Sequence, residues 1–204
     1  MTSNREAIGR LFRVLHDHTA NQPPLPAIYP DQLAPVVRIG PDGTREMLTM
    51  RWGFPPPPAL TTRLVTNVRN TASAYWRPWL APHYRCLVPA TEFCEYSDNL
   101  PKTQYWFARG PDRPAFAFAG IWRPWHGVRK GESGEHLLFS FLTTSPNALM
   151  RPIHAKAMPV ILSSTDQDAW LQAPLEEALT LQKPCADDHL VIVAKGEHQQ
   201  TSLF

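Results

Sequence analysis

Cysteine is scarce in this sequence, which has three cysteines in 204 residues, at positions 86, 94 and 185. Their irregular spacing fits neither a disulfide framework nor a zinc site, and it is typical of a protein from a reducing compartment. The sequence also lacks any run of about 18 apolar residues, which excludes a membrane-spanning helix, and it lacks an apolar signal core at its start. We therefore expect a cytoplasmic protein with no metal, no cofactor and no membrane partner.

Acidic residues are absent between Glu46 and Glu92, although the net charge of the whole chain is only +2. Arginine provides 15 of the 20 basic residues. The acid-free span contains five arginines and five interleaved aromatic residues: Arg51, Arg63, Arg69, Arg77 and Arg85, with Trp52, Tyr75, Trp76, Trp79 and Tyr84. Guanidinium groups suit phosphate contacts and aromatic rings stack on unpaired bases, so the span predicts a surface for a nucleic-acid strand. The alternative is an arginine-rich surface over core aromatics.

The pattern of apolar residues predicts an α+β fold of mainly antiparallel strands with peripheral helices, in a single domain over residues 1–204. Strands are expected within 36–54, 85–98, 104–125, 135–146, 153–162 and 189–197, the first as a hairpin around Pro41-Asp42-Gly43. Helices are expected over 2–15, 71–81, 164–172 and 174–182, with capping boxes at Ser3 and Thr165. The four prolines at 55–58 predict a rigid spacer.

Two reactive side chains stand next to each other in the segment CLVPATEFCEYSD, at Cys94 and Glu95. On a strand they point to opposite faces, so they do not converge on one substrate atom. A free cysteine behaves mainly as a small buried hydrophobe, and we interpret Cys94 as structural. A carboxylate within an apolar strand has a raised pKa, which suits Glu95 for proton transfer.

His154 directly precedes another predicted strand, and Asn67 and Arg69 lie together at the end of one. An amide and a guanidinium at a strand end can hold an oxyanion, a phosphate or a base edge. In this order, four segments resemble the SRAP family (SOS response-associated peptidase domain): RWGF at 51–54, NVRN at 67–70, CLVPATEFCEY at 86–96 and IHAKAMPVIL at 153–162. FAFAGIW at 116–122 and FLTTSPN at 141–147 match further strands, so the resemblance covers nearly the whole chain.

The resemblance implies a barrel-like or two-sheet fold and a role in the response to DNA damage. Family members recognise abasic sites in single-stranded DNA and capture the ring-opened sugar aldehyde in a covalent thiazolidine crosslink. The nucleophile is a cysteine exposed by removal of the initiator Met, whose α-amine forms a Schiff base before its thiol closes the ring. Carried over by position, Asn67 orients the N-terminal group, Glu95 is the general acid/base and His154 assists ring opening and proton transfer. DNA contacts are implied for Arg69, Tyr96, Lys156, Trp52 and Thr143, in a monomer that associates with the nucleoid.

The sequence departs from the family in its first residues, because Thr2 and not a cysteine follows Met1. We expect that the native protein begins upstream with Met-Cys. The alternatives are a family member that binds DNA without crosslinking, or recruitment of Cys94, which the strand geometry opposes. The segment from Phe54 reads FPPPP, where relatives often carry a tryptophan that wedges into DNA. Two other functions stay open: a peptidase or amidase that acts on proteins in trans, and a non-covalent single-stranded DNA-binding domain.

Overall fold

Five strands form a closed, barrel-like sheet in the computed structural model, which describes residues 4–19, 27–56 and 63–196. In order around the barrel they are β3 (Arg45–Trp52), β2 (Leu33–Ile39), β5 (Arg85–Ala90), β8 (Phe116–Arg129) and β9 (Glu132–Thr144). Neighbours are antiparallel, except that β9 returns to β3 in parallel through Arg51 opposite Leu138 and Trp52 opposite Phe139. The predicted α+β, barrel-like fold with mainly antiparallel strands is confirmed.

The first hairpin of the barrel forms where the sequence predicts it. β2 and β3 pair in register from Leu33 opposite Arg51 to Ile39 opposite Arg45. In the turn between them Gly43 adopts a φ of 79°, which glycine tolerates without a steric penalty. Asp42 Oδ1 accepts bonds from the backbone and the hydroxyl of Thr44 at 3.0 and 2.8 Å, and these bonds lower the pKa of the Asp42 carboxyl. The turn chemistry therefore fixes the register of the hairpin.

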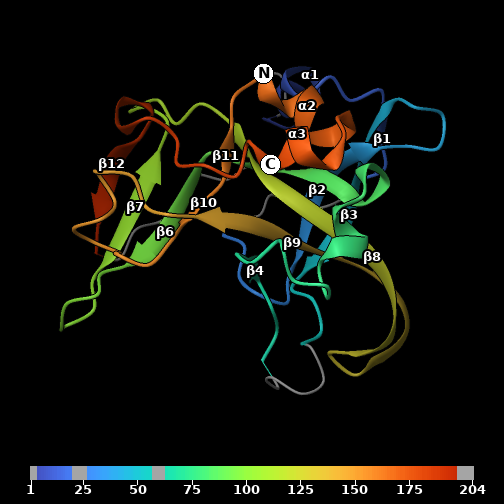
Figure 1. Ribbon diagram of the computed structural model, residues 1–204, viewed down its shortest axis with the longest axis horizontal. Coiled ribbons are helices and arrows are strands. Elements are labelled where there is room, and N and C mark those ends of the chain that lie inside the picture. The colour runs from blue at the N-terminus through green and yellow to red at the C-terminus, as the bar shows by residue number, and fades with distance from the viewer. Residues whose placement is uncertain (1–3, 20–26, 57–62, 197–204) are drawn as a thin grey trace.

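A second sheet stands beside the barrel, at the left in Figure 1, and consists of β12 (Val191–Lys195), β7 (Gln104–Ala108) and β6 (Glu92–Tyr96), all antiparallel. Only the buried Thr91 separates β5 of the barrel from β6 of this sheet. Four two-residue strands complete the barrel sheet: β1 (His16–Asp17) on β3, β4 (Asn67–Val68) and β10 (Met158–Pro159) on β9, and β11 (Ile161–Leu162) on β8. Because β4 belongs to the barrel and β6 to the second sheet, Asn67 and Glu95 approach from different layers.

The helices are short and gather on one side of the barrel, at the top in Figure 1: α1 (Asn4–Leu11), α2 (Asp166–Gln172) and α3 (Leu175–Leu179). The helix expected over 71–81 is instead a turn followed by two 3-10 helices, Arg77–Leu80 and Pro82–Tyr84, each with a proline in its first turn. A third 3-10 helix, Asp187–His189, precedes β12. The side chains of the capping box at Ser3, and Pro57 and Pro58 of the proline spacer, lie outside the described residues.

The capping box predicted at Thr165 is wrong. Thr165 makes no side-chain cap, and Ser163 Oγ accepts the Asp166 backbone N–H at 3.2 Å in its place. Asp168, the expected partner of Thr165, pairs with Arg13 and, at 2.6 Å, with Arg45. Two cationic partners outcompete a backbone N–H for one carboxylate because charge-assisted hydrogen bonds are the stronger ones.

The acid-free arginine–aromatic span divides between interior and surface, so its prediction as a strand-binding surface can hold for only part of its residues. Arg85 is 1% exposed, and its guanidinium donates to the carbonyls of Leu80, Trp170 and Ala173 at 2.7 to 3.0 Å. Arg51 and Trp76 are 8% exposed. Of the five arginines, Arg63, Arg69 and Arg77 remain exposed. Buried arginines here satisfy backbone carbonyls that would otherwise lack donors.

Candidate functional site

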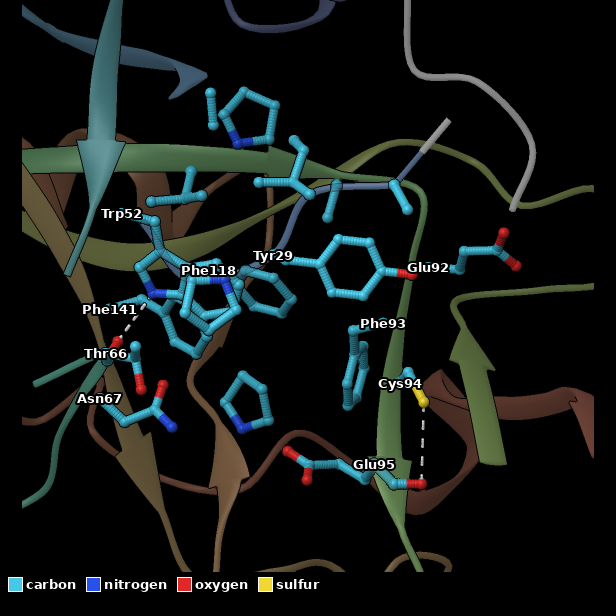
Figure 2. A pocket seen from close by; sticks show the side chains of 18 of the residues that line it. Tyr29, Trp52, Thr66, Asn67, Glu92, Phe93, Cys94, Glu95, Phe118 and Phe141 are labelled. Atoms are coloured by element: carbon cyan, nitrogen blue, oxygen red, sulfur yellow. Dashed lines mark hydrogen bonds between the residues drawn. The ribbon is translucent and has the colours of Figure 1, made fainter. Parts of the chain in front are cut away.

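A cavity of about 340 Å³ opens between the barrel and the second sheet, and Figure 2 shows the side chains around it. Its walls are mainly aromatic, formed by Trp52, Phe93, Phe118, Phe139 and Phe141. Thr66, Asn67 and Glu95 supply polar groups to it. An apolar cavity with a few convergent polar groups is the usual form of a ligand site, and this volume lies at the small end of the range.

Glu95 reaches the cavity because β6 alternates its side chains. Phe93 and Glu95 project toward the cavity and toward Asn67, whereas the Cys94 side chain leaves the opposite face of the strand (Figure 2). Removal from water raises the pKa of the Glu95 carboxyl. The electrostatic interaction with His154 lowers this pKa, and the negative charge of Asp98 raises it further. Glu95 therefore holds its proton to higher pH than an exposed glutamate, as a general acid requires.

Cys94 has the properties of a structural residue. Burial, assisted by the neighbouring Glu95 charge, raises the pKa of its thiol to about 11. Its Sγ lies 4.0 Å from the carbonyl oxygen of Glu95. Since the thiolate is the reactive form, a thiol that stays protonated near pH 7 is a poor nucleophile.

His154 is held next to the site by Asp98. The Nδ1 atom of His154 lies 3.5 Å from Asp98 Oδ1, while Asp98 Oδ2 accepts the Ala155 backbone N–H at 2.8 Å. The Asp98 backbone N–H donates to the carbonyl of Ile153, also at 2.8 Å. The end of β6 and the His154 segment are therefore tied together by one residue. Sequence reasoning missed Asp98, and its only signal is its place three residues after Glu95.

Asn67 faces Glu95 across the cavity from β4, with its amide nitrogen directed toward the carboxyl side (Figure 2). Two residues further, the guanidinium of Arg69 donates to the carbonyls of Thr144 and Lys156 at 2.7 and 3.2 Å and to Ser145 Oγ at 3.1 Å. Arg69 thus joins the end of β4 to β9 and to the His154 segment. Arg69 and Lys156 are both exposed, and each lies two residues along the chain from a predicted catalytic residue, Asn67 or His154.

The other three predicted DNA contacts differ in their surroundings. Tyr96 lines the cavity and is 49% exposed, with its hydroxyl accepting a bond from Gln104 Nε2 at 2.8 Å. Trp52 forms part of the wall: its indole packs on Phe139 and Phe141, and its Nε1 donates to the carbonyl of Thr66 at 3.0 Å. Thr143 is 5% exposed and is not part of the cavity lining, so the structure gives it no surface for a strand.

Glu92, the other acidic residue of the cavity lining, already has a cationic partner. Glu92 is 2% exposed and pairs with Arg113 at 3.0 Å. Within the described residues, no three His, Cys, Asp or Glu side chains form a group that could hold a metal ion. No helix in the same part of the chain is long and apolar enough to span a membrane. Glu95 and Asn67 line the cavity, and the His154–Asp98 pair lies outside the lining but affects the pKa of Glu95.

Comparisons with known proteins agree with this geometry. The family model for SRAP, described as SOS response associated peptidase, matches residues 1–195. The abasic site processing proteins YoqW and YobE of Bacillus subtilis (strain 168) are 30% and 31% identical over 139 residues, which is 64% of this chain. The match spans 59% of YoqW and 61% of YobE.

Solved structures support the same fold at lower identity. A protein from Bordetella bronchiseptica superposes with a TM-score of 0.73 at 23% identity, over 92% of this chain and 93% of its own. A protein from Bacteroides thetaiotaomicron gives 0.64 at 24% identity, over 79% and 73%. Since the family model covers nearly the entire length, this chain belongs to the SRAP family, that of the SOS response associated peptidases.

Proposed function

We propose that the protein recognises abasic sites in single-stranded DNA and shields them by covalent attachment to the opened sugar. The observation that carries the proposal is the desolvated Glu95 carboxyl, placed across a sugar-sized cavity from Asn67 and within electrostatic reach of His154. The family membership and the names of YoqW and YobE as abasic site processing proteins support the same reading. Exposed Arg69, Lys156 and Tyr96 provide phosphate and base contacts beside the cavity.

The covalent step is the condensation of an aminothiol with an aldehyde. The α-amine of an N-terminal cysteine adds to C1 of the opened sugar, and the resulting hydroxyl leaves as water when Glu95 donates a proton to it. The thiolate then adds to the imine carbon and the nitrogen takes a proton, which gives a thiazolidine. The balance is one aldehyde and one aminothiol consumed, and one thiazolidine and one water formed. Asn67 orients the amine, and His154 assists ring opening.

The proposal is tested with single strands that carry one abasic site. A version of the protein that begins Met-Cys forms an adduct that survives denaturing electrophoresis, whereas the 204-residue chain, with Thr2 after Met1, binds the strand but forms no thiazolidine. Cys94→Ala in the Met-Cys version leaves the yield of adduct unchanged, because the thiol of Cys94 faces away from Asn67. Equal adduct formation by the 204-residue chain, or its loss in Cys94→Ala, would contradict the proposed nucleophile.

Binding without any adduct in both versions would support the non-covalent alternative. Such binding weakens steeply with salt, because phosphate contacts release counterions. Equal affinity for intact and abasic strands would show that the protein does not recognise abasic sites.

Replacement of Asp98 by Asn shifts the pH dependence of adduct formation. The negative charge of Asp98 raises the pKa of the Glu95 carboxyl, so its removal lowers that pKa. Glu95 then loses the proton that it donates at a lower pH than in wild type. The alkaline limb of the pH–rate profile therefore shifts to lower pH. The measurement is the adduct rate in the Met-Cys version between about pH 5 and pH 9. Asp112→Asn, which changes an exposed carboxylate, is the control and leaves the profile unchanged. A shift of the alkaline limb to higher pH in Asp98→Asn would refute the interaction between Asp98 and Glu95.

A further inference from the structure

A tightly anchored turn over residues 29–32 presents one aromatic ring at the rim of the cavity. Asp31 in this turn has a φ of 67°, in the left-handed region that few residues other than Gly, Asn and Asp adopt. Tyr29, two residues earlier, lines the cavity and is 60% exposed. Unusual backbone conformations that the surrounding structure enforces cluster at functional sites, so this turn is a candidate for a role in ligand binding.

Three residues from two barrel strands, β3 and β8, fix the turn. The Asp31 backbone N–H donates to the carbonyl of Trp52 at 2.8 Å, and the Trp52 N–H donates to the carbonyl of Gln32 at 2.9 Å. Two buried arginines add to these bonds: Arg51 donates to the Asp31 carbonyl at 2.7 Å, and Arg129, from the far end of β8, lies 3.3 Å from Asp31 Oδ1. A segment held in this way keeps its geometry when a ligand arrives.

The same turn also fixes the backbone of Tyr29 itself. The Tyr29 N–H donates to Gln32 Oε1 at 2.9 Å, and the Gln32 N–H donates to the Tyr29 carbonyl at 3.1 Å. Its neighbour Ile28 packs against the core, whereas more than half of the Tyr29 side chain faces solvent. The anchoring therefore orders a ring that contributes little to the core.

The position of the ring suggests its ligand. In Figure 2, Phe93 lies between Tyr29 and Glu95, and Asn67 lies on the Glu95 side of the view. Tyr96, also half exposed and part of the cavity lining, directly follows Glu95 on β6, so strand alternation turns its side chain toward the Cys94 face. A strand whose abasic sugar sits at Glu95 thus meets the exposed ring of Tyr29 at the rim of the same cavity.

We propose that Tyr29 stacks on the base next to the abasic nucleotide and is a specificity-determining residue; this inference rests on the proposed binding of abasic single strands. A base beside an abasic site has lost its stacking neighbour, and a pre-ordered tyrosine ring supplies a replacement face. In an intact strand the neighbouring base already covers that face. Tyr29 therefore favours abasic over intact strands.

The test uses 2-aminopurine as a fluorescent base in a single strand that contains a tetrahydrofuran abasic analogue, which binds without crosslinking. The probe is placed directly 5′ of the analogue, directly 3′ of it, or several nucleotides away. With the 204-residue chain, fluorescence is quenched at one of the two adjacent positions. Tyr29→Leu removes this quenching and weakens binding by roughly 5- to 100-fold, while Tyr29→Phe retains both.

Leu15→Ala, which also changes an exposed apolar residue, is the matched control and leaves quenching and affinity unchanged. Wild-type quenching and affinity in Tyr29→Leu would overturn the role of Tyr29 and leave the proposed function intact. Loss of quenching in Tyr29→Phe would overturn it as well, because the hydroxyl and not the ring would then be responsible. Equal affinity of the wild-type chain for abasic and intact strands would instead count against the proposed function.

Discussion

Glu95→Gln slows adduct formation by about 10²- to 10⁴-fold in the Met-Cys version, the range expected when a general acid/base is removed. The amide keeps the size and polarity of the side chain but has no proton to donate to the leaving hydroxyl. Affinity for a strand with the tetrahydrofuran analogue stays nearly the same, because binding needs no proton transfer. Single-turnover rates from denaturing gels and affinities from fluorescence anisotropy separate the two effects.

The stability of Glu95→Gln provides an internal control. The pKa of Glu95 is raised in the folded protein, so the unfolded chain releases this proton first, and the wild type loses stability as pH rises through the folded pKa. The Gln variant lacks this loss, and its Tm relative to wild type is therefore higher at neutral pH than at acid pH. Glu176→Gln, an exposed change on α3, leaves both rate and Tm unchanged. Joint loss of binding and adduct in Glu95→Gln would make Glu95 structural.

Arg85→Leu lowers the free energy of unfolding by about 3–5 kcal/mol, because three buried carbonyl bonds lose their donor. For a chain of this size the loss corresponds to a Tm lower by roughly 6–20 °C. Thermal unfolding followed by circular dichroism measures it. Affinity for single strands, measured at a temperature where the variant is folded, stays as in wild type.

Arg77→Leu is the matched control, since Arg77 belongs to the same acid-free span but is exposed. Its Tm stays within about 2 °C of wild type, as is usual for surface substitutions. If Arg85→Leu kept the wild-type Tm and lost affinity for DNA, the reading of this span as a strand-binding surface would be restored for Arg85.

The local features of the fold were predictable where neighbouring residues decide them. The hairpin follows from turn residues at Pro41-Asp42-Gly43, and the opposite directions of Cys94 and Glu95 follow from strand alternation. Glu95 could be identified from the sequence because a carboxylate within an apolar strand is costly to bury and has a raised pKa. The capping box at Thr165 failed because Arg13 and Arg45, far away in sequence, claim the Asp168 carboxylate.

The remaining features depend on contacts that no local pattern encodes. Arg69 and Arg85 are the same residue type in the same basic span. Arg69 is exposed, whereas Arg85 is buried against α2. Asp98 acquires its role only when the His154 segment folds back against the end of β6. The parallel closure of β9 on β3 joins strands that are distant in sequence, and short-range periodicity carries no information about it.

That closure has a kinetic consequence. The hairpins β2–β3 and β8–β9 involve neighbouring residues and are entropically easy to form, whereas pairing Trp52 with Phe139 closes a long loop. We therefore expect β3 and β9 to meet late in folding. Because Trp52 and Phe139 both line the cavity, partly folded molecules lack the site altogether. If the cavity holds the abasic sugar as proposed, a chain that has not yet closed its barrel has no binding site for that sugar.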